Sequence, residues 1–136
     1  QAACGTVLPT KGTVFISVND PDKPTILPVA KRLRDMGFGI ATTRGTASFL
    51  FERGVFPEVV LKVHEGTPNV VDHMRAGKIQ MLINTPLGRH SQQGDQEMRI
   101  EAVRRKIPYT TTTSAAEAAV EGIAALKEGA LRIRKL

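Results

Sequence analysis

A chain of 136 residues is long enough for one domain with its own hydrophobic core and too short for two ordinary ones. Its 41% hydrophobic and 24% charged residues are typical of a soluble globular protein, and no apolar run approaches the roughly 18 residues that cross a bilayer, so no membrane partner is expected. The formal net charge of +6 is spread along the chain, and five Phe and one Tyr are few aromatics for stacking on bases, which favours a small anionic ligand over a nucleic acid.

Apolar, β-branched runs alternate with helical patterns along the whole chain. In chain order, the expected strands are 12–18, 38–42, 58–63, 79–85 and 107–112. The expected helices run from 25–27 to 36, and over 46–54, 69–77, 96–106 and 114–129, with a polar loop at 86–95. This alternation predicts a three-layer α-β-α fold of the α/β class, with a five-stranded, mainly parallel, Rossmann-like sheet.

The starts of two helices are expected from local chemistry. Asp20 or Asp22 could cap the first helix, which should start only near 25–27 because Pro28 is best tolerated in a first turn. Ser114 followed by Glu117 has the spacing of a capping box for the last helix.

The ends of the chain suggest its context. The chain starts at Gln1 without a methionine or a signal region, so we expect a fragment of a longer polypeptide. We assign 12–129 to the domain and 130–136 to a basic C-terminal tail. The single cysteine, Cys4, cannot form an internal disulfide, which fits a reducing, cytoplasmic setting.

In an open parallel sheet, ligands bind beyond the carboxyl ends of the strands, where helix N-termini present unpaired N–H groups. In the junction "TTRGT", Thr43 and Thr46 flank Gly45, whose missing side chain would let an oxyanion approach the backbone. The alternative for Thr46 is that it only caps its helix. Lys23 and Lys62, near other strand ends, could add charge to the same phosphate or be solvated surface residues.

The remaining polar junction residues have two readings each. Asn84 and Thr85 could hydrogen-bond a base, a sugar or a carbonyl, or only terminate their strand. His64 and Glu65 could transfer a proton, although neighbours on a loop point in different directions. No metal-ligand spacing and no nucleophile motif occur, so no metal and no catalytic residue are expected.

Five segments also carry a resemblance to a known family. In chain order they are "GTVFISVNDPDK", "ATTRGT", "LKVHEGTPNVVDHMRAGKI", "LINTPLGR" and "RRKIPYTTT". Over 12–128 the chain resembles the C-terminal allosteric domain of the carbamoyl phosphate synthetase large subunit, which has a methylglyoxal synthase-like fold. Residues 1–11 resemble the linker that follows the second synthetase half.

The resemblance implies a regulatory domain of a cytoplasmic, glutamine-dependent ligase of arginine and pyrimidine biosynthesis. Its partners would be the rest of the large subunit and the glutaminase small subunit, with possible oligomer contacts. No cofactor is expected in this domain, because ATP, Mg and bicarbonate would be used elsewhere in the subunit.

The resemblance also implies the effectors and their site. UMP as inhibitor and IMP as activator would share one pocket, with phosphate contacts at Lys23, Thr43, Gly45, Thr46 and Lys62, and with Asn84 and Thr85 against base or sugar. Pro86 stands where the family often has a threonine. Relatives that respond to N-acetylglutamate place a tryptophan near Lys62, and the absence of Trp from this chain favours a nucleotide.

Two further functions follow from the same resemblance. Ornithine activates many bacterial relatives through a Tyr-Asp-Thr run that matches Tyr109, Thr110 and Thr111, with Thr110 in place of the acid. The alternative function is methylglyoxal synthase, acting on dihydroxyacetone phosphate. That reaction needs a carboxylate base, which the synthase carries in a Gly-Gly-Asp run, and the match here ends in Thr67.

Overall fold

The computed structural model describes residues 7–86 and 92–135. These residues form the strands β1 (Thr13–Ser17), β2 (Gly39–Thr42), β3 (Glu58–Val59), β4 (Met81–Asn84) and β5 (Tyr109–Thr110). All neighbouring pairs are parallel, in the order β3-β2-β1-β4-β5. Parallel neighbours need crossover connections, which here contain helices. The predicted five-stranded α/β sheet is confirmed.

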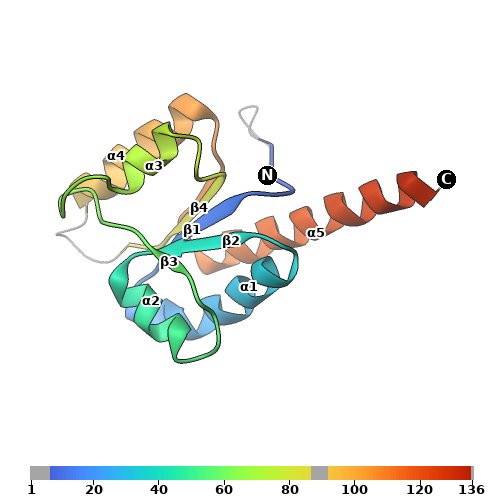
Figure 1. Cartoon of the computed structure of the whole chain (residues 1–136), viewed down its shortest axis with the longest axis horizontal. Coiled ribbons are helices and arrows are strands. Elements are labelled where there is room, and N and C mark those ends of the chain that lie inside the picture. Colours follow the sequence, from blue (N-terminus) through green and yellow to red (C-terminus); the bar gives the residue numbers. More distant parts are fainter. Residues whose placement is uncertain (1–6, 87–91, 136) are drawn as a thin grey trace.

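Helices cover both faces of the sheet, with α1, α2 and α5 on one face and α3 and α4 on the other (Figure 1). Their bounds are η2 (Asp20–Asp22), α1 (Lys23–Asp35), α2 (Arg44–Phe51), α3 (Val70–Arg75), α4 (Gln92–Arg105) and α5 (Thr113–Lys135). Alternation along β1 sends Ile16 into the core under α1, α2 and α5, and Phe15 into the core against α3 and α4. No helix among the described residues is long and apolar enough to cross a bilayer.

The register of the central strands brings polar residues to one edge. Within the ladder, Ile16 is opposite Thr42, and Ser17 is opposite Asn84. Because β1, β2 and β4 run in the same direction, their carboxyl ends lie side by side. All three residues Ser17, Thr42 and Asn84 are at most 2% exposed. The sheet thus gathers buried hydroxyl and amide groups at its carboxyl edge.

Several predicted helix ends are wrong. α1 begins at Lys23, so Pro28 lies inside the helix, where it removes one backbone hydrogen bond. The buried stripe on either side of Pro28, which includes Ile26 and Val29, packs into the core and offsets this loss. α5 begins at Thr113, and the hydroxyl that accepts from the Ala115 N–H is that of Thr112, not Ser114.

Other boundaries also moved. β3 ends at Val59 instead of 63, because its partner β2 ends at Thr42, opposite Val59, and Leu61 forms an isolated bridge with Asn69 instead. α4 already includes 92–95, which we predicted as loop. The rest of that loop, 87–91, and residues 1–6 of the expected linker lie outside the described residues. α5 continues to Lys135, through most of the segment that we assigned to a tail.

One buried charge joins α3 to α4. The Glu101 side chain is 2% exposed and pairs with Arg105 at 2.6 Å, Arg104 at 3.0 Å and Arg75 at 3.4 Å. The hydrogen bond from Arg105 is the largest cause that lowers the pKa of Glu101, and the charges of all three arginines also lower it. Part of the positive charge of the chain is therefore used in ion pairs with a buried carboxylate and is not available to a ligand.

Candidate functional site

A pocket of about 270 Å³ opens at the carboxyl edge of the sheet. It lies between the ends of β1, β2 and β4, the turn after β3 and the first turns of α4. Its apolar wall contains Phe15, Val63, Val70 and Met98, and its polar lining contains Ser17, Thr43, Lys62, His64, Glu65, Asn84 and Asp95. The pocket thus combines an apolar surface with hydroxyl, amide and charged groups, which is typical of a small-molecule site.

Two buried hydroxyls form the inner end of this pocket. The side-chain oxygens of Ser17 and Thr43 lie 3.3 Å apart, and the residues are 2% and 4% exposed. Thr43 is the N-cap residue of α2, yet its side chain makes no capping hydrogen bond. The first N–H groups of α2 therefore have no cap from this residue and remain available to an acceptor beyond the helix.

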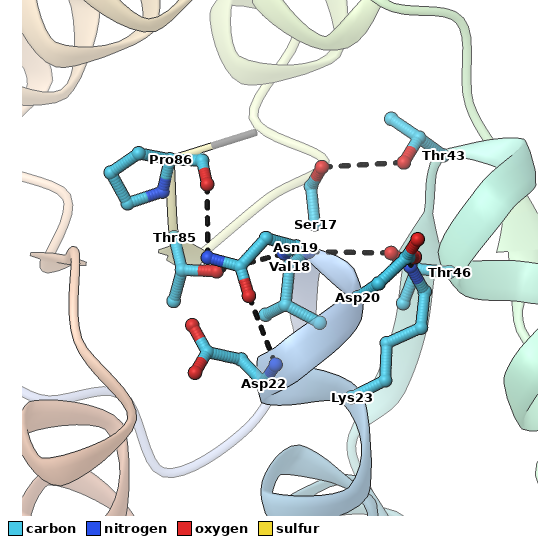
Figure 2. A network of polar contacts seen from close by, with 10 residues as sticks. All are labelled: Ser17, Val18, Asn19, Asp20, Asp22, Lys23, Thr43, Thr46, Thr85 and Pro86. Atoms are coloured by element: carbon cyan, nitrogen blue, oxygen red, sulfur yellow. Dashed lines mark hydrogen bonds and ion pairs between the residues drawn. The ribbon is translucent and has the colours of Figure 1, made fainter. Parts of the chain in front are cut away.

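Thr46 fixes the start of α2 against the end of β1. Its hydroxyl accepts a hydrogen bond from the Val18 N–H at 3.3 Å, and the residue is 2% exposed. Figure 2 shows the Ser17–Thr43 and Val18–Thr46 contacts bridging the same two elements. The alternative that Thr46 caps its own helix is wrong, because Thr43 occupies the N-cap position.

Thr85 is occupied by contacts within the chain. Its hydroxyl accepts from the Asn19 N–H at 3.0 Å, and the Asn19 amide donates to the Pro86 carbonyl at 3.0 Å (Figure 2). The Asn19 side-chain oxygen also accepts from the Asp22 N–H at 2.9 Å and caps η2. Neither Asp20 nor Asp22 caps α1 with its side chain. Sequence reasoning missed Asn19, although its place before Asp-Pro is typical of a cap.

Lys23 begins α1 and lies next to this network. Its side chain is only 13% exposed, and its ammonium pairs with the exposed carboxylate of Asp20. The hydrogen bond from Lys23, and then its charge, holds the pKa of Asp20 below its usual range. A cation in the first turn of a helix is disfavoured by the helix dipole, so Lys23 depends on a nearby anion.

The turn after β3 supplies the charged rim of the pocket. The Lys62 N–H donates to Glu65 Oε1 at 2.9 Å, and Glu65 Oε2 lies 3.3 Å from Arg44 Nη2. The Lys62 ammonium has no hydrogen bond or ion pair with the residues that the structure describes. His64 Nε2 lies 3.6 Å from Glu97 Oε2. His64 and Glu65 thus have partners on different helices, as expected for neighbours that point apart.

Asn84 closes the other side of the pocket. Its amide donates to Asp95 Oδ1 at 2.9 Å and to the Tyr109 hydroxyl at 3.0 Å. Burial raises the pKa of Tyr109, and the hydrogen bond from Asn84 opposes that shift. Asp95 lies in the first turn of α4, so this helix brings its carboxylate to the pocket.

The predicted site residues therefore fall into three places. Thr43, Lys62 and Asn84 line the pocket. Lys23, Gly45, Thr46 and Thr85 are not among the described residues that line it, and the last two make the internal hydrogen bonds given above. Tyr109, Thr110 and Thr111 line a second cavity of about 720 Å³.

Ser17 and Asp95 line the pocket and were missed as site residues. A polar Ser17 near the carboxyl end of the apolar strand predicted over 12–18 was the available signal. No group of three or more metal-ligating side chains occurs in the part of the chain that the structure describes.

Comparison with known proteins gives consistent matches. Residues 25–111 match the MGS-like domain family. Over its full length the chain is 46% identical to the carbamoyl phosphate synthase large chain of Gemmatimonas aurantiaca and 48% identical to the C-terminal section of that of Methanopyrus kandleri. It spans 12% of the first protein and 25% of the second.

Two solved structures share the fold at low sequence identity. Methylglyoxal synthase from Elizabethkingia anophelis NUHP1 matches with a TM-score of 0.64 and 16% identity, over 83% of this chain and 79% of that one. ForH matches with a TM-score of 0.56 and 16% identity, over 81% and 77% of the two chains.

Proposed function

The chain belongs to the MGS-like domain family, and from this we propose that it is the regulatory domain of a carbamoyl phosphate synthase large chain. Its effectors would be nucleoside monophosphates, UMP as inhibitor and IMP as activator, bound in the pocket at the carboxyl edge of the sheet. The similarity to C-terminal sections of such large chains supports the proposal that the domain belongs to a large chain of this kind. The chemistry of the pocket supports the ligand.

The uncapped start of α2 carries the proposal. A phosphate beside Thr43 would accept from the first N–H groups of α2 and from the hydroxyls of Ser17 and Thr43. Gly45 lies in this first turn, and a Cβ there would meet no atom within 4 Å. Glycine in a helix costs roughly 0.5–1 kcal/mol relative to alanine, so packing alone gives no reason for it. Close approach of a ligand to the backbone would explain a glycine at this position.

Two lysines would supply charge to the phosphate. The Lys62 ammonium at the rim of the pocket has no partner among the described residues. Lys23 would exchange its exposed partner Asp20 for the phosphate. Lys62 would gain a charge-assisted hydrogen bond, which is roughly twice as strong as a neutral one, and Lys23 would exchange a singly charged carboxylate for a phosphate dianion.

The rest of the pocket suits a nucleoside. The apolar wall that includes Phe15, Val70 and Met98 offers a surface for the flat face of a base. Asn84 and Asp95 place an amide and a carboxylate near one another, and these groups can bond sugar hydroxyls or base edges.

Methylglyoxal synthase activity has less support. Thr67, which matches the catalytic acid of the synthase, has no carboxylate, is exposed and is not among the described residues that line the pocket. Glu65 is held by the Lys62 N–H and Arg44, and Asp95 by Asn84. Formation of methylglyoxal from dihydroxyacetone phosphate by the purified chain would overturn the proposal in favour of the enzyme.

Calorimetric titration of the chain with UMP and IMP tests the binding part. Both should bind, while uridine and inosine, which lack the phosphate, should bind far more weakly. No heat at millimolar nucleotide, or equal binding of nucleoside and nucleotide, would contradict a phosphate site.

The regulatory part needs the full-length synthase, because allostery requires different affinities for two states of the whole subunit. UMP should lower carbamoyl phosphate formation and IMP should raise it. Nucleotide binding without any change in rate would contradict regulation while leaving the binding site intact.

A further inference from the structure

The second cavity, separate from the nucleotide pocket, has its own chemistry. We propose that it binds a small organic anion, a carboxylate on a short apolar stem. The cavity holds about 720 Å³ and lies between α4, β5 and α5. This volume is in the range of small-molecule sites, roughly 300–1,000 Å³.

The charge of the lining is positive. It contains Arg99 and Lys106, and no described residue of the lining carries a carboxylate. Neither of these two side chains makes a hydrogen bond or ion pair with a residue that the structure describes. The Arg99 guanidinium lies 5.1 Å from the centre of the Tyr109 ring, which holds it beside the cavity. Both cations therefore keep their donors for an anion.

Lys106 is held there in an unfavourable backbone conformation. It follows the end of α4 with a φ of 58°, in the left-handed region where glycine is usual after a helix. The turn is fixed by hydrogen bonds from the Lys106 N–H to the Val103 carbonyl at 3.2 Å and from the Ile107 N–H to the Ala102 carbonyl at 2.9 Å. Glycine would relieve the strain but would supply no ammonium group to the cavity.

The opposite wall is apolar and made of small residues. On α5 it contains Ala115, Ala118, Ala119 and Gly122, and Leu8 completes it. A Cβ on Gly122 would lie 2.7 Å from the tip of the Leu8 side chain, so glycine lets Leu8 pack closely against α5 here. An apolar stem would pack against these residues while its carboxylate faces Arg99 and Lys106.

This chemistry separates the cavity from an ornithine site. The ornithine side chain would bring an additional ammonium group toward two cations, with the hydroxyls of Thr110 and Thr111 but no carboxylate among the described residues of the lining to pair with it. Glutarate, glutamate and ornithine have the same five-carbon skeleton and differ in charge. We expect affinity to fall in that order, and the binding of glutarate to weaken with added salt.

Titration of the 136-residue chain with each compound, followed by amide NMR, tests the proposal. Glutarate should shift the amides of Thr111 and Gly122, with ornithine the weakest of the three. Three results would overturn it: tighter binding of ornithine, no shift around the cavity, or shifts confined to Ser17 and Thr43. The readout does not depend on nucleotide binding, so either proposal can fail alone.

Substitutions then test whether the Lys106 ammonium group contributes to binding of the anion. Lys106→Gln should weaken glutarate binding about fivefold, the scale of one exposed ion pair, while Lys106→Arg should retain it. Lys78→Gln removes an exposed charge that does not line the cavity and should change nothing. Equal affinities for Lys106→Gln and the unsubstituted chain would contradict the proposal.

Discussion

The junctions into α2 and α3 differ in how their helix N-termini are satisfied. Before α3, Asn69 accepts from the N–H groups of Val71 at 2.9 Å and Asp72 at 3.3 Å, and Asp72 accepts from the Asn69 N–H at 2.8 Å. Before α2, Thr43 makes no side-chain capping bond. A capped helix uses its first N–H groups within the chain, whereas an uncapped one leaves them to solvent or ligand. The junction into α3 stabilises the fold, and the junction into α2 is open to binding.

The contrast does not depend on residue type. Thr112 precedes α5 and accepts from the Ala115 N–H at 3.0 Å, so it caps its helix. Thr43 precedes α2 and has its hydroxyl beside that of Ser17 instead. One threonine serves the helix and the other faces the pocket, and this difference can be tested by substitution.

The largest effect is expected at the capped junction. Asn69→Ala removes the cap and also two bonds from the Asn69 amide, to the Val63 and Gly66 carbonyls at 3.1 and 3.2 Å. We expect the free energy of unfolding to fall by about 2–3 kcal/mol, measured by urea denaturation. Asn69→Asp keeps the capping oxygen and should lose about half as much. A free energy of unfolding that is unchanged within error in Asn69→Ala would contradict the proposed difference between the two junctions.

The matched pair Thr43→Val and Thr112→Val separates binding from stability. Thr43→Val should weaken UMP binding at least tenfold, about 1.4 kcal/mol, because a hydroxyl contact to a charged phosphate is lost. Its free energy of unfolding should change little. Thr112→Val should lower the free energy of unfolding by about 1 kcal/mol and leave UMP binding unchanged. The same pattern in both variants would show that the junctions are equivalent.

Gly45→Ala should move binding and stability in opposite directions. Alanine is favoured in a helix and meets nothing within 4 Å, so thermal denaturation should show a gain of about 0.5–1 kcal/mol. The added methyl group should weaken UMP binding, measured by calorimetry. Gly129→Ala, in a helix and also free of contacts within 4 Å, is the control that should gain stability without affecting binding. Unchanged UMP affinity in Gly45→Ala would exclude close approach at this turn.

The sequence predicted the sheet because its signals are local. The β-branched runs of β1 and β4 and the spacing of apolar residues in α1 need no knowledge of neighbours. The start of α1 was predicted wrongly because burial of one helix face, a tertiary effect, outweighs the single backbone hydrogen bond that Pro28 removes. The early end of β3 depends on where its partner β2 ends, at Thr42 opposite Val59, which no local pattern in β3 specifies.

The candidate site was less predictable from the sequence, because its contacts join elements that are far apart along the chain. Asn84 ends β4 and Thr43 directly follows β2, so their position at the carboxyl edge follows from the order of elements. The contact between Ser17 and Thr43 depends on how β1 pairs with β2, and that between Asn84 and Asp95 on where α4 begins. Sequence alone also cannot tell that the hydroxyls of Thr46 and Thr85 bond to backbone N–H groups.

The smallest effect is expected at the start of α1, where the N-cap side chain, like that of α2, makes no capping hydrogen bond. Asp20 is ionised at neutral pH, as an aspartate of ordinary pKa also is, and its ion pair with Lys23, which lowers that pKa further, competes with a phosphate for the ammonium group. Asp20→Asn should therefore tighten UMP binding about two- to threefold, the scale of an exposed ion pair, by calorimetry at pH 7. Asp22→Asn, a neighbouring carboxylate without this ion pair, should have less effect. Weaker binding in Asp20→Asn would mean that Asp20 positions Lys23 for the ligand instead of competing with it.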